Sequence, residues 1–290
     1  MLKRTLTALL LIPPVVYLIG WSPKWVFMLA VAAAVVLALR EYFGLCRAMG
    51  LKVFAGIGYA ASVAVCLVET LPGDLYCGAL PPLIATVLLL VCTLALRSSV
   101  DLREYLSTIS ASIFGILYIG FTLACLLPIR FSLNALGNAS IVRVELNPRV
   151  GLSLGSRMIL LLFIVIWAGD ICAYLVGRSM GRVPFFSRIS PRKTWEGAGA
   201  GLVGSLAAGG LFAHWFLAGT HLPAVLLLSA LIGIAGQVGD LVESALKRGA
   251  NQKDSGTLLP GHGGFLDRID SLLFAAPALW LALLGLGCFS

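Results

Sequence analysis

Long apolar runs alternate with short polar segments along the whole chain. A helix needs roughly 20 apolar residues to cross the hydrocarbon core, with about 17 to 25 being usual. Helices are the expected spanning form, because each satisfies its own backbone polar groups in lipid. The pattern predicts an all-α fold, a polytopic transmembrane helical bundle of about nine spans: 5–20, 25–39, 53–71, 79–96, 108–127, 158–176, 197–217, 222–239 and 272–288.

The first two runs leave alternatives open. They are short and close together, so they could instead form a re-entrant or interfacial pair. The start of the chain, Met1-Leu-Lys-Arg-Thr followed by 6–20, is similar to a signal peptide. A second apolar run follows almost at once, and we therefore expect a retained first span.

Composition supports the membrane interpretation. Hydrophobic residues make up 59% of the 290 residues and charged residues only 12%. Soluble domains carry about 25% charged residues, so most of this surface must face lipid. The seven Cys lie mostly inside apolar runs and include no C-x-x-C pair. We interpret them as small packed residues and expect no disulfide framework.

The basic residues predict the direction of the spans. The net charge of +8 is carried by short loops, which indicates membrane topology rather than a nucleic-acid partner. With a cytoplasmic N-terminus, only five of the 21 basic residues fall on the outer side. The expected location is the bacterial inner (cytoplasmic) membrane, with the protein crossing it many times. The five outer residues are Lys24, Arg130, Arg143, Arg149 and Arg157.

The chain divides by the character of its inner loops. Residues 1–155 have short loops and form the predicted N-terminal transmembrane region. Residues 156–290 form the predicted catalytic transmembrane region, because they contain two long inner loops rich in charge and glycine, 177–196 and 240–271. We found no internal repeat and infer no use for the outer segment 128–157.

The loop 240–271 brings acids and bases together beside a span. An ordinary solvated loop is the simpler explanation, but the spacing argues against it. Four polar residues recur at i, i+3, i+4 and i+7, one stripe of a helix that would continue the eighth span. A carboxylate where a helix leaves lipid needs a partner and is by default functional. The stripe is Asp240, Glu243, Ser244 and Lys247, and the nearby glycines that would allow close helix packing are Gly233, Gly236 and Gly239.

A glycine-rich turn follows. Pro260-Gly-His-Gly-Gly264 predicts a loop whose backbone N–H groups can approach a ligand. Asp267 and Asp270 are expected to open the last helix and share one face. Carboxylates without a Cys or His cluster suit a hard cation such as Mg²⁺, and nearby Lys and Arg suit phosphates. His262 could serve a phosphate or a proton, or could only cap the turn.

A second inner cluster lies before the seventh span. Asp170 is near the inner end of the sixth span, with Tyr174 one turn later and Arg178 after it. Asp170 could serve the chemistry or could only pair with Arg178. The segment 190–197, Ser-Pro-Arg-Lys-Thr-Trp-Glu-Gly, places hydroxyls and cations together. Its simpler explanation is a positive-inside loop with an interfacial Trp.

These motifs together resemble the phosphatidate cytidylyltransferase (CDP-diglyceride synthase) family. The resemblance is carried by Ser244-Ala-Leu-Lys247-Arg248, Lys253-Asp254-Ser-Gly256 and Leu259-Pro260-Gly-His262-Gly263-Gly264-Phe-Leu-Asp267-Arg268-Ile-Asp270. The 190–197 segment and Asp170-x-x-x-Tyr174 are also similar, although the family more often has Lys at the position of Arg192. The resemblance is sharp from about 167 to 271, and upstream it rests on span count and hydropathy.

The resemblance implies that CTP and phosphatidic acid react to CDP-diacylglycerol and pyrophosphate with Mg²⁺, a step of phospholipid biosynthesis. It implies catalytic roles for Asp240, Asp267, Lys247 and His262, with the metal on Asp240 and Asp267; Asp170 is our third candidate ligand. The expected substrate-binding residues are Ser190, Arg192, Lys193, Thr194, Ser244, Arg248, Lys253, Gly263, Gly264 and Arg268.

Three other functions would also account for parts of this sequence. A transporter would also contain intramembrane acids such as Asp170, but its polar residues should lie near the midplane rather than at one face. A CDP-alcohol phosphotransferase would need an Asp-Gly-x-x-Ala-Arg core, which this sequence lacks. A scaffold without catalysis should tolerate substitutions in its charged loops. The sequence contains no Walker-type phosphate-binding loop, which argues against ATP hydrolysis. A homodimer is compatible with the sequence.

Overall fold

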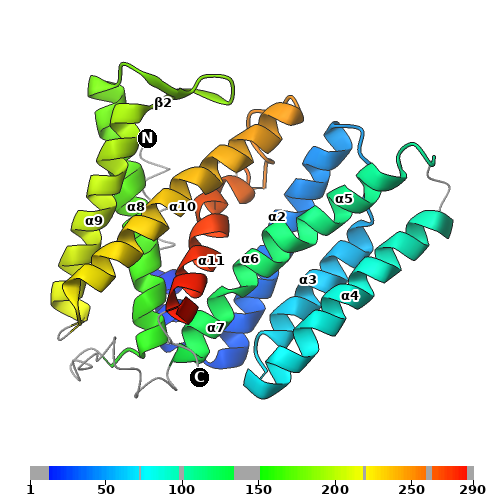
Figure 1. Cartoon of the computed structure of the whole chain (residues 1–290), viewed down its shortest axis with the longest axis horizontal. Helices are drawn as coiled ribbons and strands as arrows, with labels where there is room; N and C mark the ends of the chain where they lie inside the picture. The colour runs from blue at the N-terminus through cyan, green and yellow to red at the C-terminus, as the bar shows by residue number, and fades with distance from the viewer. Residues whose placement is uncertain are drawn as a thin grey trace. The chain divides into compact units, whose positions relative to one another are not determined.

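Helices dominate the computed structural model, which describes residues 13–71, 73–97, 101–133, 151–217, 220–258 and 263–285 (Figure 1). Each predicted apolar run corresponds to helix in this part of the chain, beginning with residues 13–21. The further helices are α2 (Lys24–Ala48), α3 (Ala55–Val68), α4 (Gly73–Arg97), α5 (Tyr105–Gly115), the π-helix η1 (Ile116–Phe121), α6 (Thr122–Ala124), α7 (Leu126–Phe131), α8 (Leu154–Met180), α9 (Trp195–Phe216), α10 (Leu222–Gly249), the 3-10 helix η4 (Leu266–Arg268) and α11 (Asp270–Gly285).

Among the described residues, five helices are long and apolar enough to cross a membrane. α3 and α11 are shorter apolar helices. α9 is not among the five, because its many glycines and His214 lower its mean hydropathy. The chain is therefore a helical protein with several membrane-spanning segments, and the count of nine stays a prediction. The five are Lys24–Ala48, Ala79–Arg97, Tyr105–Phe131, Leu154–Met180 and Leu222–Gly249.

One part of the inner loop 177–196 departs from the all-α prediction. Strands β1 (Pro184–Phe186) and β2 (Ser190–Thr194) pair antiparallel, with Pro184 opposite Thr194. The Phe185 ring packs edge-on against Trp195, with 4.3 Å between the ring centroids. Aromatic residues favour strands, and here they stabilise a hairpin. The charge and glycine content of this segment had indicated a loop.

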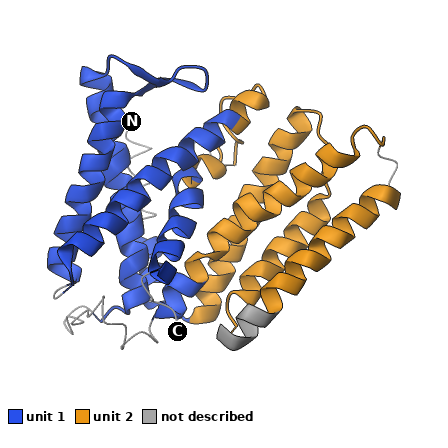
Figure 2. Cartoon of the chain, in the orientation of Figure 1, with its two compact units in different colours: residues 1–23, 128–245, 270–290 blue, residues 24–127, 246–269 orange. Residues whose placement is uncertain are grey.

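The chain forms two compact units (Figure 2). Unit 1 comprises 1–23, 128–245 and 270–290, and unit 2 comprises 24–127 and 246–269. Packing therefore does not follow the division at residue 155, because the segment 246–269 packs with the N-terminal helices. The predicted division at residue 155 was based on the charge and glycine content of the inner loops. The assignment of catalysis to residues 156–290 stays a prediction.

Unit 2 is built around α2. Leu39 and Phe43 on this helix are fully buried. A Cβ on Gly58 of α3 would lie within 3 Å of the Phe43 ring, and one on Gly115 of α5 would lie within 3 Å of the Tyr42 ring. The Tyr42 hydroxyl also donates to the carbonyl of Ala111 at 2.8 Å. Close packing on several sides makes α2 a rigid element.

Unit 1 depends on close approach between helices. A Cβ on Gly233 of α10 would lie 2.7 Å from Ser205 Oγ of α9. A Cβ on Gly239 would lie 2.6 Å from the carbonyl oxygen of Asp270, at the start of α11. These contacts confirm that the α10 glycines serve close packing.

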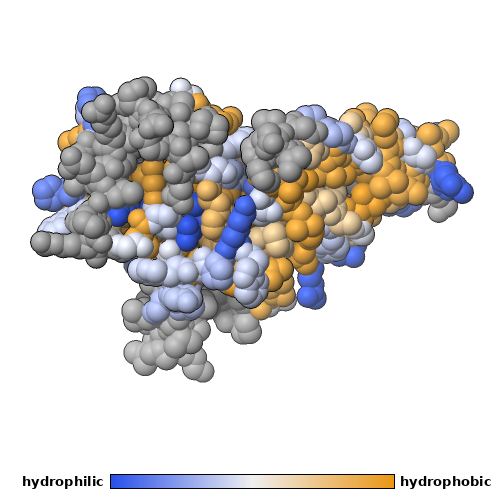
Figure 3. Space-filling model, turned by 90° about the horizontal axis from the view of Figure 1, so that it is seen from below, coloured by the Kyte–Doolittle hydropathy of each residue, from blue (hydrophilic) through white to orange (hydrophobic). Residues whose placement is uncertain are grey.

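Hydrophobic residues cover a large part of the described surface on one face of the molecule (Figure 3). Helix α4 exposes several of them, with Leu89 and Leu96 each 67% exposed. Contiguous apolar surface on this scale is unusual for a soluble monomer and is typical of contact with lipid.

Candidate functional site

Asp240 of α10 forms an ion pair within unit 1. Lys193 of β2 approaches Asp240 with 2.6 Å between Nζ and Oδ2. The two side chains are 28% and 34% exposed. Ser244 Oγ, one turn further along α10, lies 3.4 Å from Asp240 Oδ1. The structure therefore brings together three predicted site residues from the two inner loops.

Asp170 of α8 belongs to the same group of charges. The charges of Asp240 and Lys193 both act on its carboxylate. The alternative pairing with Arg178 does not occur, since Arg178 Nη1 donates to the Tyr174 hydroxyl at 2.9 Å. Asp170 and Arg178 are eight residues apart on a helix, which places them about 12 Å apart along the axis.

Thr194 has a structural contact in addition to its predicted ligand role. Its hydroxyl accepts a hydrogen bond from the Gly197 N–H at 3.2 Å and caps α9. Glu196, in the first turn, accepts from the Val183 N–H. Hydrogen bonds from its own N–H and those of Arg182 and Val183 lower the pKa of the Glu196 carboxyl. The junction between hairpin and helix is thus fixed by side-chain contacts.

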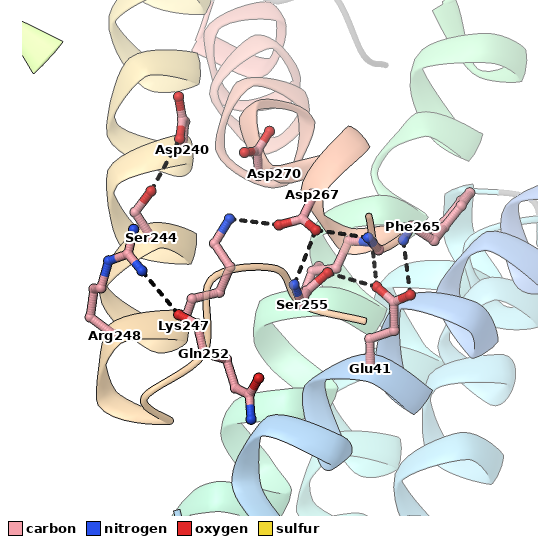
Figure 4. Close-up of polar contacts among 12 residues, drawn as sticks. Glu41, Asp240, Ser244, Lys247, Arg248, Gln252, Ser255, Phe265, Asp267 and Asp270 are labelled. Carbon is pink, nitrogen blue, oxygen red and sulfur yellow. Dashed lines mark hydrogen bonds and ion pairs between the residues drawn. The ribbon is translucent and has the colours of Figure 1, made fainter. Parts of the chain in front are cut away.

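Asp267 of unit 2 accepts three hydrogen bonds from its own segment of the chain (Figure 4). Its Oδ1 accepts from Lys247 Nζ at 2.6 Å, and the two side chains are only 10% and 13% exposed. Its Oδ2 accepts from the N–H groups of Ser255 at 3.0 Å and Gly264 at 2.8 Å. Asp267 therefore organises the loop around it.

The helical assignment of this region is right in one part and wrong in another. Helix α10 does continue the eighth span, through Lys247 to Gly249, as the stripe of polar residues predicted. Asp267 does not share the last helix with Asp270, because it lies in the separate 3-10 helix η4. Ile269, with a φ of −122°, interrupts the helix between them.

The glycine turn does not leave all its amides available. Gly263 has a φ of +80°, a conformation that glycine adopts readily. The N–H of Gly264, however, is donated to Asp267. The next two N–H groups, of Phe265 and Leu266, are donated to another carboxylate, Glu41. His262 and the rest of 259–262 lie outside the described residues.

Glu41 is the site residue that the sequence analysis missed. It lies on α2, is 7% exposed, and accepts from Phe265 N–H at 2.9 Å and Leu266 N–H at 2.8 Å. It also accepts from the Ser255 hydroxyl at 2.8 Å. The one available signal was an acid near the end of an apolar run, which the rule applied to Asp170 would have flagged.

A cavity of about 300 Å³ lies beside this loop within unit 2. One wall is a turn and a half of α2, and the other is the segment that follows α10. Its lining mixes apolar and polar groups, which suits a polar ligand. The lining residues are Gly44, Leu45, Ala48, Gln252, Lys253, Asp254, Ser255, Gly256 and Thr257.

The remaining predicted residues fall into two groups. Arg248 donates to the carbonyl of Gln252 at 3.1 Å, and Arg268 lies in η4. Ser190 and Arg192 lie on β2, and Arg192 and Lys253 are exposed. Exposed cations of this kind are available for phosphate groups.

Unit 1 contains two carboxylates that are candidate ligands for a magnesium ion. Within the described ranges no group of three or more His, Cys, Asp and Glu side chains could hold a metal. Mg²⁺ is, however, usually bound through one or two carboxylates together with waters and substrate phosphates. Asp170 and Asp240 are two such carboxylates whose charges act on each other. Asp267 stays a predicted ligand.

Comparison with known proteins gives one consistent result. The model of the family described as "Cytidylyltransferase family" matches residues 2–285. The chain is 37% identical over 257 residues to phosphatidate cytidylyltransferase 5, chloroplastic, of Arabidopsis thaliana, covering 86% of this chain and 64% of that protein.

Two bacterial relatives agree. The chain is 36% identical over 274 residues to the phosphatidate cytidylyltransferase of Synechocystis sp., covering 88% of this chain and 87% of the relative. It is 47% identical over 122 residues to that of Bacillus subtilis, covering 41% and 45%. The chain thus spans a little less than two thirds of the plant relative and most of the Synechocystis one.

Proposed function

Because the chain belongs to the cytidylyltransferase family, we propose that it transfers the cytidylyl group of CTP to phosphatidic acid. The products would be CDP-diacylglycerol and pyrophosphate, in phospholipid biosynthesis. The observation that carries the proposal is the family match over residues 2–285, a range that includes both carboxylate–lysine pairs, Asp240 with Lys193 and Asp267 with Lys247.

The chemistry requires charge neutralisation more than a base. A phosphate oxygen of phosphatidic acid is already anionic and attacks the α-phosphorus of CTP. The bond from that phosphorus to the bridging oxygen breaks, and pyrophosphate leaves with the electron pair. The obstacle is repulsion between two polyanions, which positioned cations reduce. Lys193, Arg192, Lys253 and Arg268 are the cations we assign to the phosphates.

Mg²⁺ is the cofactor that we propose, held in unit 1 by Asp170 and Asp240. When bound, it would offset phosphate charge and orient the reacting groups. Lys193 holds the Asp240 carboxylate in place at 2.6 Å and would pass to a phosphate when the ion binds. Asp267 holds the Ser255 and Gly264 amides and the Lys247 ammonium, so it acts at least as a loop organiser. We retain His262 as a proposed catalytic residue.

The membrane setting follows from the same assignment. We propose nine spans with a cytoplasmic N-terminus in the bacterial inner membrane, since CTP is cytoplasmic and the basic loops then face it. The lipid phosphate would lie at the headgroup level. A homodimer is a further prediction, which the mass of the protein–detergent complex would measure.

The direct test is turnover by purified protein in detergent with CTP, phosphatidic acid and Mg²⁺. We expect liponucleotide and pyrophosphate in equal amounts, and no product when EDTA removes the metal. Absence of product from folded wild-type protein with Mg²⁺ present would contradict the proposal. The transporter alternative receives no support from the comparisons, and binding of labelled CTP distinguishes it from the enzyme.

A further inference from the structure

Glu41 accepts hydrogen bonds from two consecutive backbone amides of a distant loop. The N–H groups of Phe265 and Leu266, at the start of η4, both point at its carboxylate (Figure 4). Consecutive amides at the start of a helical turn form an anion-binding nest. Here the anion is a side chain supplied by a helix more than 200 residues away in sequence. The loop is therefore fixed to α2 through this carboxylate.

The Glu41 carboxylate is closely packed against the loop. A Cβ on Gly264 would lie 2.5 Å from Glu41 Oε2, and one on Gly256 would lie 2.6 Å from Glu41 Oε1. The Ser255 hydroxyl donates to Oε2. Since Tyr42 and Phe43 beside it are packed against α3 and α5, α2 can hold the carboxylate in one position. The loop must follow that position.

Glu41 also joins the two walls of the 300 Å³ cavity. One wall is formed by Gly44, Leu45 and Ala48, which begin one turn after Glu41 on the same helix. The opposite wall contains Ser255, whose hydroxyl is bonded to Glu41, and Gly256, which packs against it. The width of the cavity is therefore set by the Glu41 contacts.

We propose that Glu41 is a positioning residue for CTP, because it holds the wall of a cavity that receives the nucleotide. The inference rests on the proposed function. Lys253 lines the cavity and offers a cation for phosphate, and Asp254 offers a carboxylate of the kind that accepts the amino group of cytosine. A volume near 300 Å³ is at the lower end of the range for small-ligand sites.

The first test is Glu41→Gln. The amide keeps the shape but replaces one acceptor oxygen with a donor, which must face an N–H group. Leaving a buried donor unpaired in this way shifts the loop, so the KM for CTP should rise about tenfold. The KM for phosphatidic acid should stay at its wild-type value. A merely structural role would lower the active fraction and leave the KM for CTP unchanged.

The matched control is Glu104→Gln in the same unit. Glu104 pairs with Lys52 at 3.0 Å, and both side chains are about half exposed. Exposed pairs contribute little, so all kinetic constants should stay within about twofold of wild type. Hydrogen exchange gives a second readout: the Phe265 and Leu266 amides should exchange faster in Glu41→Gln and unchanged in Glu104→Gln.

A second variant fills the cavity from its other wall. A Cβ added at Gly44 meets no atom within 4 Å, so Gly44→Leu projects into open space without a clash. Leucine has a higher helix propensity than glycine, so the variant should retain the fold. We expect the KM for CTP to rise at least about tenfold, since the side chain would displace ligand atoms.

The outcomes separate this inference from the proposed function. Wild-type protein without CTP-dependent product would overturn both. With active wild-type protein, a rise in the KM for CTP in both variants supports the inference. A wild-type KM for CTP in either folded variant overturns the role of Glu41 and its cavity, while the enzyme assignment remains.

Discussion

The two units each contain a carboxylate paired with a lysine at 2.6 Å, but the surroundings differ. In unit 1, Asp240 is 34% exposed, and the Ser244 hydroxyl lies 3.4 Å from its other carboxylate oxygen. In unit 2, Asp267 is 10% exposed and accepts two further backbone hydrogen bonds. A loosely held carboxylate can exchange partners with an ion or ligand, whereas a fully bonded one maintains structure. Identical pair distances thus accompany different roles.

The largest expected effect separates the two aspartates. Asp240→Asn should abolish CTP-dependent product with only a small change in melting temperature, because its carboxylate is one-third exposed and solvent screens its ion pair with Lys193. Asp267→Asn should also abolish product and, in addition, lower stability by about 2 kcal/mol, since a buried ion pair with Lys247 is replaced by a neutral contact. Product assays and thermal unfolding in detergent measure the two. Asp101→Asn, on an exposed loop, is the control. Near-normal turnover in both variants would end the assignment of catalytic roles to these acids.

The second effect concerns the lysine of unit 1. Lys193→Met removes the cation that competes with a metal for Asp240, so the half-saturating Mg²⁺ concentration should fall. The same variant removes a phosphate ligand, so the KM for CTP should rise about tenfold. Titrating activity with Mg²⁺ at saturating CTP measures the first change. A higher Mg²⁺ requirement would contradict the proposed exchange of partners.

A smaller effect tests the cap next to Lys193. Thr194→Ala removes the hydroxyl that accepts from Gly197 N–H, which should cost about 1 kcal/mol of stability. Thr194→Ser keeps the hydroxyl and should stay close to wild type. Equal melting temperatures for the two variants would show that the cap contributes nothing.

The smallest effect depends on pH. Hydrogen bonds from backbone N–H groups lower the pKa of the Glu196 carboxyl in the folded chain. A lowered folded pKa adds stability above the usual carboxyl pKa, and this stability is lost as the pH falls through the folded value. Glu196→Gln should therefore melt slightly below wild type at neutral pH and equal to it in acid. A difference that persists in acid would contradict this origin.

The sequence predicted the helices well, because long apolar runs in lipid must satisfy their backbone polar groups as helices. It also predicted the extension of α10 beyond the lipid, since a polar stripe at helical spacing leaves few other structures. It missed the β1–β2 hairpin, where aromatic packing between Phe185 and Trp195 outweighs composition. It placed Asp267 on the last helix, because no local signal marked the break at Ile269.

The candidate site was predicted where its members are close in sequence. Lys247 and Asp267 come from one signature segment, and Lys193 comes from the other inner loop. Glu41 was missed because its partners Ser255, Phe265 and Leu266 are more than 200 residues away, and only the fold brings them together. The sequence also did not indicate that the Gly264 amide is donated to an acid three residues later, and the substrate-binding role of Gly264 stays a prediction.

The course of the chain between the two units limits how the protein can be divided into separately expressed fragments or chimeras. The chain passes between the two units at 23/24, 127/128, 245/246 and 269/270, and the third passage falls inside helix α10. Neither unit is therefore one continuous stretch that a single gene fragment could encode. A chimera that exchanges only the first half for that of a relative would have to preserve the Glu41 contacts with a loop from the other parent. Recombination between relatives should succeed only where both partners of those contacts are inherited together.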